Sequence, residues 1–306
     1  MFSVENRWPH YRDSVKVEWN LGKRCNLDCT YCPAEIHDNF SSHKDLSTLY
    51  KTVDKLAEIK NVRISFTGGE PCVHPDFEKL VDYARPKIKW LSVTTNITRK
   101  PKYYQDLNAN YLVLSLHFED KQWQERLETI RVLAGTLGGG KHPKDYHVMV
   151  MAHHDYMDEV KLTTRILIEH NVPFSLRRIR WTERHDWFDD MRYKLDDLEW
   201  IKSVQTTAKA NTLVDSKDLV HTNDLLKNKL NMFKGWQCKA GIESLMINWD
   251  GEVHRATCRV GGSLGNIYEG TFEPPEEWID CTRKWCTCAA DIPLTKIDTK
   301  QVDDSN

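Results

Sequence analysis

The sequence predicts an α/β protein in which six strand–helix units build a parallel sheet, followed by a small cysteine-rich module that contains a β-hairpin. Two observations predict the first part. Short runs rich in β-branched and aromatic residues alternate with runs of helical period from residue 15 to residue 180, which is the pattern of repeated βα units. Polar and cysteine-bearing segments directly follow several of the strand-like runs. A third observation predicts the module, because five of the nine cysteines lie after residue 237.

The strand-like runs are short, apolar and bounded by polar or turn-forming residues. We expect strands at Val15–Leu21, Val62–Thr67, Trp90–Thr95, Tyr111–His117, His147–Ala152 and Phe174–Arg180. Between these runs, apolar residues recur at helical spacing. We expect helices over residues 46–59 and 77–84, and at Gln122–Leu133 and Asp158–His170. Helices in these places supply the crossover connections that parallel strands need.

The pattern changes after residue 180. Residues 181–237 are charged and polar, with a helical stretch at Leu195–Ala208. The sequence therefore predicts three segments: an α/β domain at 1–180, a helical bridge at 181–237 and a cysteine-rich module at 238–306.

Composition narrows the classes of function. The chain has 306 residues, of which 40% are hydrophobic, so it can bury a large core. Its 43 basic and 45 acidic residues give no electrostatic footprint for nucleic acid or an anionic membrane. No apolar run approaches membrane-spanning length, and the amino terminus has no signal-peptide core. We therefore expect a cytoplasmic protein, in which an odd number of clustered cysteines favours metal binding over disulfides.

Three cysteines form the most informative motif. Cys25, Cys29 and Cys32 lie within eight residues, and Tyr31 precedes the last of them. Thiolates are the usual ligands of iron–sulfur clusters, and a cluster of four irons held by three cysteines leaves one iron open to another ligand. The alternative is a structural zinc site that adds His37, although zinc fingers usually bring two ligand pairs separated by a longer loop.

The cysteine spacing, with an aromatic residue before the third cysteine, resembles the radical S-adenosylmethionine (radical SAM) superfamily. This resemblance implies that the six βα units form an open (β/α)6 barrel, a partial TIM barrel. It also implies a [4Fe-4S] cluster on Cys25, Cys29 and Cys32 whose open iron chelates the amine and carboxylate of SAM. One electron then cleaves SAM to a 5′-deoxyadenosyl radical, which takes a hydrogen from the substrate. By the same resemblance, Tyr31 lies near the adenine.

A second motif, Gly68-Gly69-Glu70, follows the predicted strand at Val62–Thr67. Two glycines allow close approach of the backbone to a ligand, and a carboxylate beside them can accept hydrogen bonds from an ammonium group. A lone pair of glycines is ordinarily a turn. Here the motif resembles the GGE motif of the radical SAM superfamily, which implies that it binds the amino group of SAM.

Polar residues also end the next strands, where the active site of a parallel α/β protein lies. Asn96 and Ser115 offer short polar groups for the ribose or the carboxylate of SAM. The family often has Ser-x-Asp at the position of Ser115, so His117 departs from its pattern, and we expect it to be a hydrogen-bonded histidine at the strand end. Arg177 either pairs with a carboxylate of SAM or substrate or makes ordinary surface salt bridges.

His153-His154-Asp155 closes the fifth predicted strand and suggests a metal site. Neighbouring residues at a strand end point to opposite sides. We therefore expect these residues to lie near the rim of the pocket without sharing one ion.

The carboxyl-terminal segment carries a second set of cysteines, at Cys238, Cys258, Cys281, Cys286 and Cys288. Asp250-Gly251 lies between two strand-like runs and predicts a hairpin with a two-residue turn. The arrangement resembles the SPASM and Twitch auxiliary modules of the radical SAM superfamily. Five cysteines suit the shorter Twitch form, which implies one auxiliary [4Fe-4S] cluster and leaves Cys281 or Cys238 as a spare. A structural zinc held by four cysteines remains the alternative, since thiolates alone do not choose between the metals.

Together these features predict a radical SAM enzyme that oxidises, epimerises or otherwise modifies a small molecule or a peptide. Its expected partners are that substrate and an electron donor such as flavodoxin or ferredoxin, with no nucleic acid and no membrane. Fewer than fifteen residues precede the first predicted strand, which favours a small substrate or a separately recruited peptide. The alternative is a non-catalytic scaffold whose zinc or iron–sulfur sites only stabilise the fold.

Overall fold

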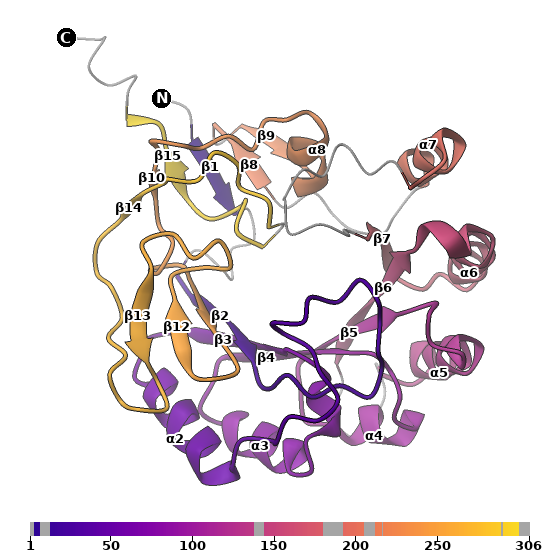
Figure 1. Cartoon of the computed structure of the whole chain (residues 1–306), viewed down its shortest axis with the longest axis horizontal. Helices are drawn as coiled ribbons and strands as arrows, with labels where there is room; N and C mark the ends of the chain where they lie inside the picture. The colour runs from indigo at the N-terminus through magenta and orange to yellow at the C-terminus, as the bar shows by residue number, and fades with distance from the viewer. Residues whose placement is uncertain are drawn as a thin grey trace.

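The computed structural model describes residues 3–6, 13–137, 144–179, 192–204, 212–215, 217–288 and 290–299. The strands of these residues form two sheets, one of nine strands and one of six. Figure 1 shows the nine-stranded sheet curving around the centre of the molecule, with helices along its outer side and the small sheet at the top left.

All six predicted strands are confirmed. They are β2 (Val15–Asn20), β3 (Val62–Thr67), β4 (Trp90–Thr95), β5 (Tyr111–Leu116), β6 (Asp145–Ala152) and β7 (Phe174–Arg178). They run parallel and pair with one another in chain order. Their carboxyl ends therefore meet at one edge of the sheet, where an active site is expected. Arg180, which the prediction included in the last strand, lies outside the described residues.

The predicted helices are also confirmed, although residues 205–208 of the expected helix Leu195–Ala208 lie outside the described residues. They are α2 (Leu46–Ala57), α3 (Phe77–Ala84), α5 (Trp123–Ala134), α6 (Met157–Glu169) and α7 (Leu195–Ser203). One short helix, α4 (Pro101–Asp106), was not predicted, because its six residues are too few to show a helical period. Within the described part of the chain no helix is long and apolar enough to cross a membrane.

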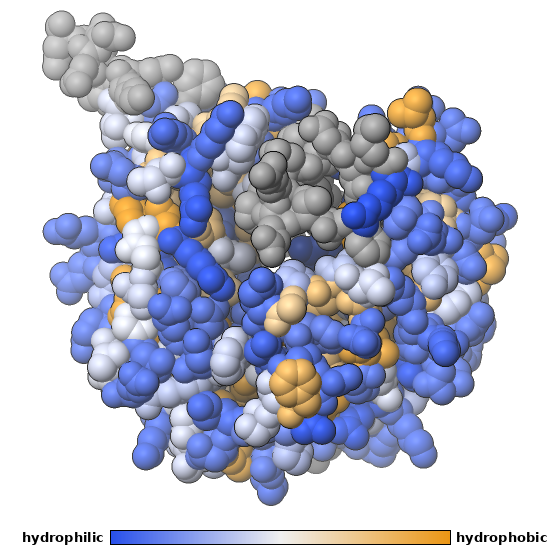
Figure 2. Space-filling model, viewed as in Figure 1, coloured by the Kyte–Doolittle hydropathy of each residue, from blue (hydrophilic) through white to orange (hydrophobic). Residues whose placement is uncertain are grey.

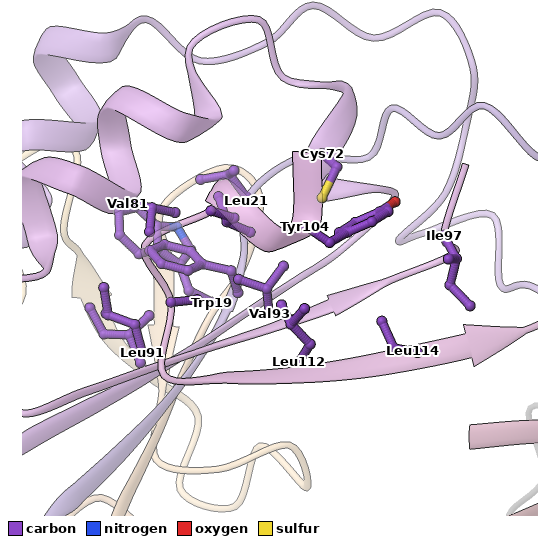
Figure 3. Packing of buried hydrophobic residues seen from close by; sticks show 14 of the residues in the cluster. Trp19, Leu21, Cys72, Val81, Leu91, Val93, Ile97, Tyr104, Leu112 and Leu114 are labelled. Carbon is purple, nitrogen blue, oxygen red and sulfur yellow. The ribbon is translucent and has the colours of Figure 1, made fainter. Parts of the chain in front are cut away.

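The main core lies between the sheet and the surrounding helices. Alternate residues of each strand point into it, as Val17 and Trp19 do from β2, because side chains of a strand alternate between its two faces. Leu49, Val53 and Leu56 meet them from α2 at helical spacing. Figure 3 shows the packing around Trp19, with Leu91, Val93 and Leu112 from neighbouring strands.

The hairpin of the carboxyl-terminal segment extends the main sheet. Strand β11 (Ser244–Ile247) pairs in parallel with β2, and β12 (Glu252–His254) and β13 (Ser263–Asn266) follow it in antiparallel order. The predicted hairpin is confirmed, but its turn is longer than expected. Asn248 accepts a hydrogen bond from Gly251 N at 3.0 Å and donates one to Glu252 O at 2.9 Å, so the loop has three residues, with Gly251 at a φ of 92°.

The six-stranded sheet contains strands from all three predicted segments. The predicted segment boundaries therefore do not divide the chain between the two sheets. Its order is β14 (Ile279–Asp280), β10 (Gln237–Cys238), β15 (Lys296–Ile297), β1 (Ser3–Asn6), β8 (Thr212–Val214) and β9 (Asp218–Val220). The expected helical bridge therefore contains two strands besides α7 and the short helix α8 (Thr222–Lys227). The reason is a small second core, in which Val4, Phe233 and Ile292 come from distant parts of the chain. Figure 2 shows that hydrophilic side chains cover most of one face of the molecule, with hydrophobic ones in small patches.

Candidate active site

The cysteine loop after β2 pairs along its backbone with the glycine motif after β3. Gly69 N donates to Gly22 O at 2.8 Å, and Glu70 N donates to Arg24 O at 2.9 Å. A methyl group at Gly69 would overlap the carbonyl oxygens of Lys23 and Arg24. Gly69 is therefore required by the close approach of the cysteine loop. Gly68 is required for a further reason, because its φ of 119° is one that only glycine adopts readily.

Glu70 is buried and ties the ends of two strands together. Its carboxylate accepts hydrogen bonds from Cys72 N at 2.9 Å, Thr95 Oγ1 at 2.9 Å and Asn96 N at 2.6 Å. Burial raises the pKa of Glu70, and the three donors act in the opposite direction. A carboxylate has about four acceptor positions, so one is left for a further donor.

The three cysteines of the loop are partly buried at this edge of the sheet. Leu27 N donates to Cys25 Sγ at 3.4 Å, and Asn96 Nδ2 donates to the same sulfur at 3.6 Å. Burial raises the pKa of Cys29 to about 12 and that of Cys32 to about 11. Thiolates at these positions therefore need the positive charge of a metal to be stable.

The histidine of the zinc alternative contacts the backbone of the cysteine loop through one of its two ring nitrogens. His37 Nε2 lies 2.7 Å from Leu27 O, so the histidine holds the cysteine loop itself.

Two residues after β5 contact the cysteine loop from the other side. His117 Nδ1 lies 2.6 Å from Tyr31 Oη and 3.7 Å from Cys29 Sγ, and the two rings are stacked. The expectation that His117 is a hydrogen-bonded histidine at the strand end is confirmed. Burial lowers its pKa to about 4, so the imidazole is neutral near pH 7.

Glu119 was not predicted as a site residue. Its carboxylate accepts from Thr30 N at 2.7 Å and from Thr30 Oγ1 at 2.6 Å. It also lies 3.1 Å from Nε2 of His153. No local motif marks Glu119, because its partner Thr30 lies 89 residues earlier in the chain.

His153, His154 and Asp155 place one ligand atom each within 4.8 Å of one another. The expectation that they diverge is wrong, because β6 ends at Ala152 and the chain turns into a 3₁₀ helix at His154–Tyr156, where strand alternation no longer applies. Both ring nitrogens of His153 nevertheless have protein partners, Glu119 Oε1 and Asp155 N. A metal ion would have to displace one of them.

The remaining predicted residues lie on the inner side of the same edge. Ser115 is buried near the end of β5 and is paired in register with Met149 of β6. Arg177 of β7 is exposed, with Nη1 3.6 Å from Met149 Sδ. The structure therefore brings Ser115 and Arg177 to neighbouring positions around Met149.

The five carboxyl-terminal cysteines lie near one another. Cys238, Cys281 and Cys286 are buried, and Cys258 and Cys288 are partly buried. The sulfur of Cys281 lies 3.7 Å from Arg283 O. Burial raises the pKa of Cys258 to about 12 and that of Cys288 to about 11, so here too thiolates require a metal.

Two charged residues that the sequence did not single out lie beside these cysteines. The carboxylate of Asp291 accepts from Cys258 N at 2.9 Å. Burial, followed by the charge of Glu18 on β2, raises the pKa of Asp291 to about 6. Lys296 is fully enclosed, and its ammonium interacts with the thiols of Cys238 and Cys286. The carboxyl-terminal cysteines therefore lie near β2 of the main sheet, since Glu18 and Lys16 also influence Cys288.

Residues 19–136 match the Radical SAM superfamily. Among curated proteins, the chain is 32% identical over 272 residues to the antilisterial bacteriocin subtilosin biosynthesis protein AlbA of Bacillus subtilis, which covers 85% of this chain and 58% of that protein. It is also 32% identical over 105 residues to Fe-coproporphyrin III synthase of Methanosarcina barkeri, covering 33% of this chain and 26% of that protein. The chain thus spans less than two thirds of the length of both relatives.

Solved structures share the fold at low sequence identity. The structure of anSMEcpe with bound AdoMet has a TM-score of 0.56 and 16% identity, and the match covers 84% of this chain and 79% of that one. SuiB of Streptococcus suis bound to S-adenosylmethionine has a TM-score of 0.55 and 15% identity, covering 84% and 64%. Both matches cover much more of the chain than residues 19–136.

Proposed function

We propose that this chain, which belongs to the radical SAM superfamily, cleaves S-adenosylmethionine reductively and takes a hydrogen atom from a peptide substrate. In this superfamily a [4Fe-4S] cluster and SAM, on receiving one electron, supply a 5′-deoxyadenosyl radical. The contribution of the protein is binding, orientation and the exclusion of water.

One observation carries the proposal. Backbone hydrogen bonds join the cysteine loop to the Gly68-Gly69-Glu70 motif at the carboxyl edge of the sheet. The two segments are more than thirty residues apart in the sequence. A scaffold held by a structural metal has no need of this arrangement.

The residues at this edge have distinct roles in the proposal. Cys25, Cys29 and Cys32 hold the cluster, and Asn96 donates to the sulfur of Cys25, a contact that tunes the potential of such clusters. Gly68 and Gly69 let the backbone of the motif lie against the cysteine loop, which keeps Glu70 beside the proposed SAM pocket. Glu70 offers its remaining acceptor position to the amino group.

Three further residues complete the proposed SAM pocket. The ring of Tyr31 is fixed by its hydrogen bond to His117 and by stacking on the same imidazole, which orients it for the adenine. Ser115 on β5 and Arg177 on β7, which lie on either side of Met149 on β6, face the carboxylate and ribose of SAM or the substrate.

A peptide substrate is favoured by the relatives. AlbA is named for its part in bacteriocin biosynthesis. SuiB was solved with its precursor peptide SuiA, and anSMEcpe with the peptide Kp18Cys. These names concern those proteins, and we extend their substrate class to this chain as part of the proposal.

The carboxyl-terminal cysteines form the auxiliary site of the proposal. Four of Cys238, Cys258, Cys281, Cys286 and Cys288 ligate a second [4Fe-4S] cluster in a module of the Twitch or SPASM type. A cluster held there would supply an acceptor for the electron of the substrate radical, or a donor of one to it. Flavodoxin or ferredoxin is the proposed reductant of the enzyme.

The test starts from protein purified without oxygen. Iron and sulfide are counted, and the protein is incubated with SAM and dithionite while 5′-deoxyadenosine is measured by mass spectrometry. The variant with Cys25, Cys29 and Cys32 changed to Ala is the control and should form none. Intact clusters without 5′-deoxyadenosine in the wild-type protein would leave the non-catalytic scaffold as the better reading.

The substrate class needs a second experiment. Deuterated peptides encoded beside the gene of this chain are added, and deuterium is sought in the 5′-deoxyadenosine. Transfer from a peptide supports the proposed substrate class. Transfer only from added small molecules would replace it.

A further inference from the structure

Lys296 on β15 is a charged residue enclosed by the auxiliary module. Only 2% of its surface is exposed. Its Nζ donates to Asp291 O at 2.6 Å and to Ile292 O and Leu294 O at 3.0 Å each. An ammonium group has three N–H donors, so all three are directed at backbone carbonyls. This geometry fixes the position of the charge.

A buried ammonium needs a compensating negative charge. Removing one from water costs several kcal/mol unless anions lie nearby. In the described residues no carboxylate forms an ion pair with Lys296. Lys296 is paired in register with Cys238 across the antiparallel strands β15 and β10, and the charged or ionisable groups that act on its ammonium are Cys238, Cys286, Asp291 and Cys258. The ring of Phe233, whose centroid lies 5.2 Å from Nζ, covers it on another side.

Lys144 provides the internal comparison. It is also buried, and its Nζ donates to Tyr104 O and Gln105 O at 3.0 Å each. Burial lowers the pKa of Lys144 to about 8, and the charge of Asp106 acts in the opposite direction. The two lysines therefore share burial and carbonyl contacts, but only Lys296 lies among cysteines.

We propose that Lys296 supplies a fixed positive charge to the auxiliary metal site, stabilising its ionised thiolates and making the bound cluster easier to reduce. The inference rests on the auxiliary cluster of the proposed function. A cluster ligated by thiolates is anionic, and one-electron reduction adds a further negative charge. A nearby positive charge lowers the energy of the reduced state more than that of the oxidised state.

The experiment uses full-length protein in which Cys25, Cys29 and Cys32 are Ala, so that only the auxiliary site remains. Iron and sulfide content is measured first, and the midpoint potential is then determined by a titration monitored by electron paramagnetic resonance. Lys296→Gln keeps an amide that can donate to the carbonyls but removes the charge. We expect its midpoint potential to shift to a more negative value, while Lys296→Arg stays near the parent.

The controls separate the possible failures. Lys144→Gln should leave the potential unchanged, which excludes a general effect of losing a buried lysine. A parent without any iron or zinc contradicts the auxiliary site of the proposed function. If the parent protein contains zinc, the rate at which a chelator removes the zinc is measured in place of the midpoint potential. Lys296→Gln should then release zinc faster than the parent. An unchanged potential or release rate in Lys296→Gln overturns the role of Lys296.

If Lys296→Gln does not fold, Lys296→Arg decides, since its failure to fold as well would show that the side chain acts through packing alone.

Discussion

Thr30 and Glu119 are joined by two hydrogen bonds, from the backbone nitrogen and from Oγ1 of the threonine to the two carboxylate oxygens of the glutamate. Thr30 lies between Cys29 and Cys32, and Glu119 follows strand β5. The middle of the cysteine loop is therefore attached to the far side of the site, opposite its attachment to Gly69 and Glu70.

Glu119→Gln should weaken this attachment. In the glutamine, an NH2 group replaces one of the two carboxylate oxygens and cannot accept a hydrogen bond. One of the two hydrogen bonds from Thr30 is therefore lost. A hydrogen bond to a charged group contributes about 1.5–3 kcal/mol, and partial exposure reduces this here to roughly 1–2 kcal/mol. We expect 5′-deoxyadenosine to form about five- to thirtyfold more slowly if this free energy positions the loop in the transition state.

The matched control is Glu128→Gln, whose carboxylate pairs with Arg131 on the exposed face of α5. Rates are measured with iron content determined on the same samples. An equal slowing in both variants, or none in Glu119→Gln, would show that the Thr30–Glu119 contact does not position the site.

Gly69→Ala should abolish assembly of the cysteine loop. The added methyl group overlaps the carbonyl oxygens of Lys23 and Arg24, which are backbone atoms that cannot rotate away. We expect loss of the iron of the catalytic cluster, measured by iron and sulfide analysis, with the rest of the fold retained.

Gly22→Ala tests the same loop without the overlap. A methyl group there has no atom within 4 Å, so we expect near-normal iron content. Normal iron in Gly69→Ala would mean that the loop adopts another path in the loaded protein.

Most of the α/β framework could be predicted because its signals are local. Strands such as β2 and β3 are runs of apolar residues whose side chains alternate into one core, as Trp19 and Phe66 do. The small sheet could not be predicted. Strand β1 pairs with β15, almost three hundred residues later, and these strands are four and two residues long. Too few residues are present for a period to appear.

The site divides in the same way. Cys25, Cys29 and Cys32 could be singled out because they lie at a recognisable spacing within one loop. Glu119 and Lys296 could not, because their partners come together only when the strands pair. Burial of a charged side chain such as Lys296 runs against its general tendency, and composition gives no signal for it.

Tyr268→Phe tests how the hairpin segment is held to the main sheet. Trp19 Nε1 donates to Tyr268 Oη at 3.1 Å, and Trp19 is completely buried. Removing the hydroxyl leaves the indole N–H without this acceptor, which costs about 1–3 kcal/mol. We expect a decrease of several °C in the apparent unfolding temperature, measured anaerobically by circular dichroism.

Tyr83→Phe serves as the comparison. Its hydroxyl donates to the exposed carboxylate of Asp54, which water can solvate once the hydroxyl is gone. We expect little change in the unfolding temperature. A similar decrease in the two variants would indicate that loss of a tyrosine hydroxyl, rather than the contact between Trp19 and Tyr268, is responsible.

Changing Cys25, Cys29 and Cys32 together to Ala should remove one cluster and leave the other. The two sets of cysteines lie on different elements, since the first follows β2 and the second lies on β10, after β12 and in residues 281–288. Iron content should therefore fall from roughly eight to roughly four atoms per chain if both sites hold [4Fe-4S] clusters.

Cys72→Ala is the control, because that thiol is buried in the main core and belongs to neither set. It should keep all the iron. Loss of all iron in the triple variant, or of none, would contradict two independent sites.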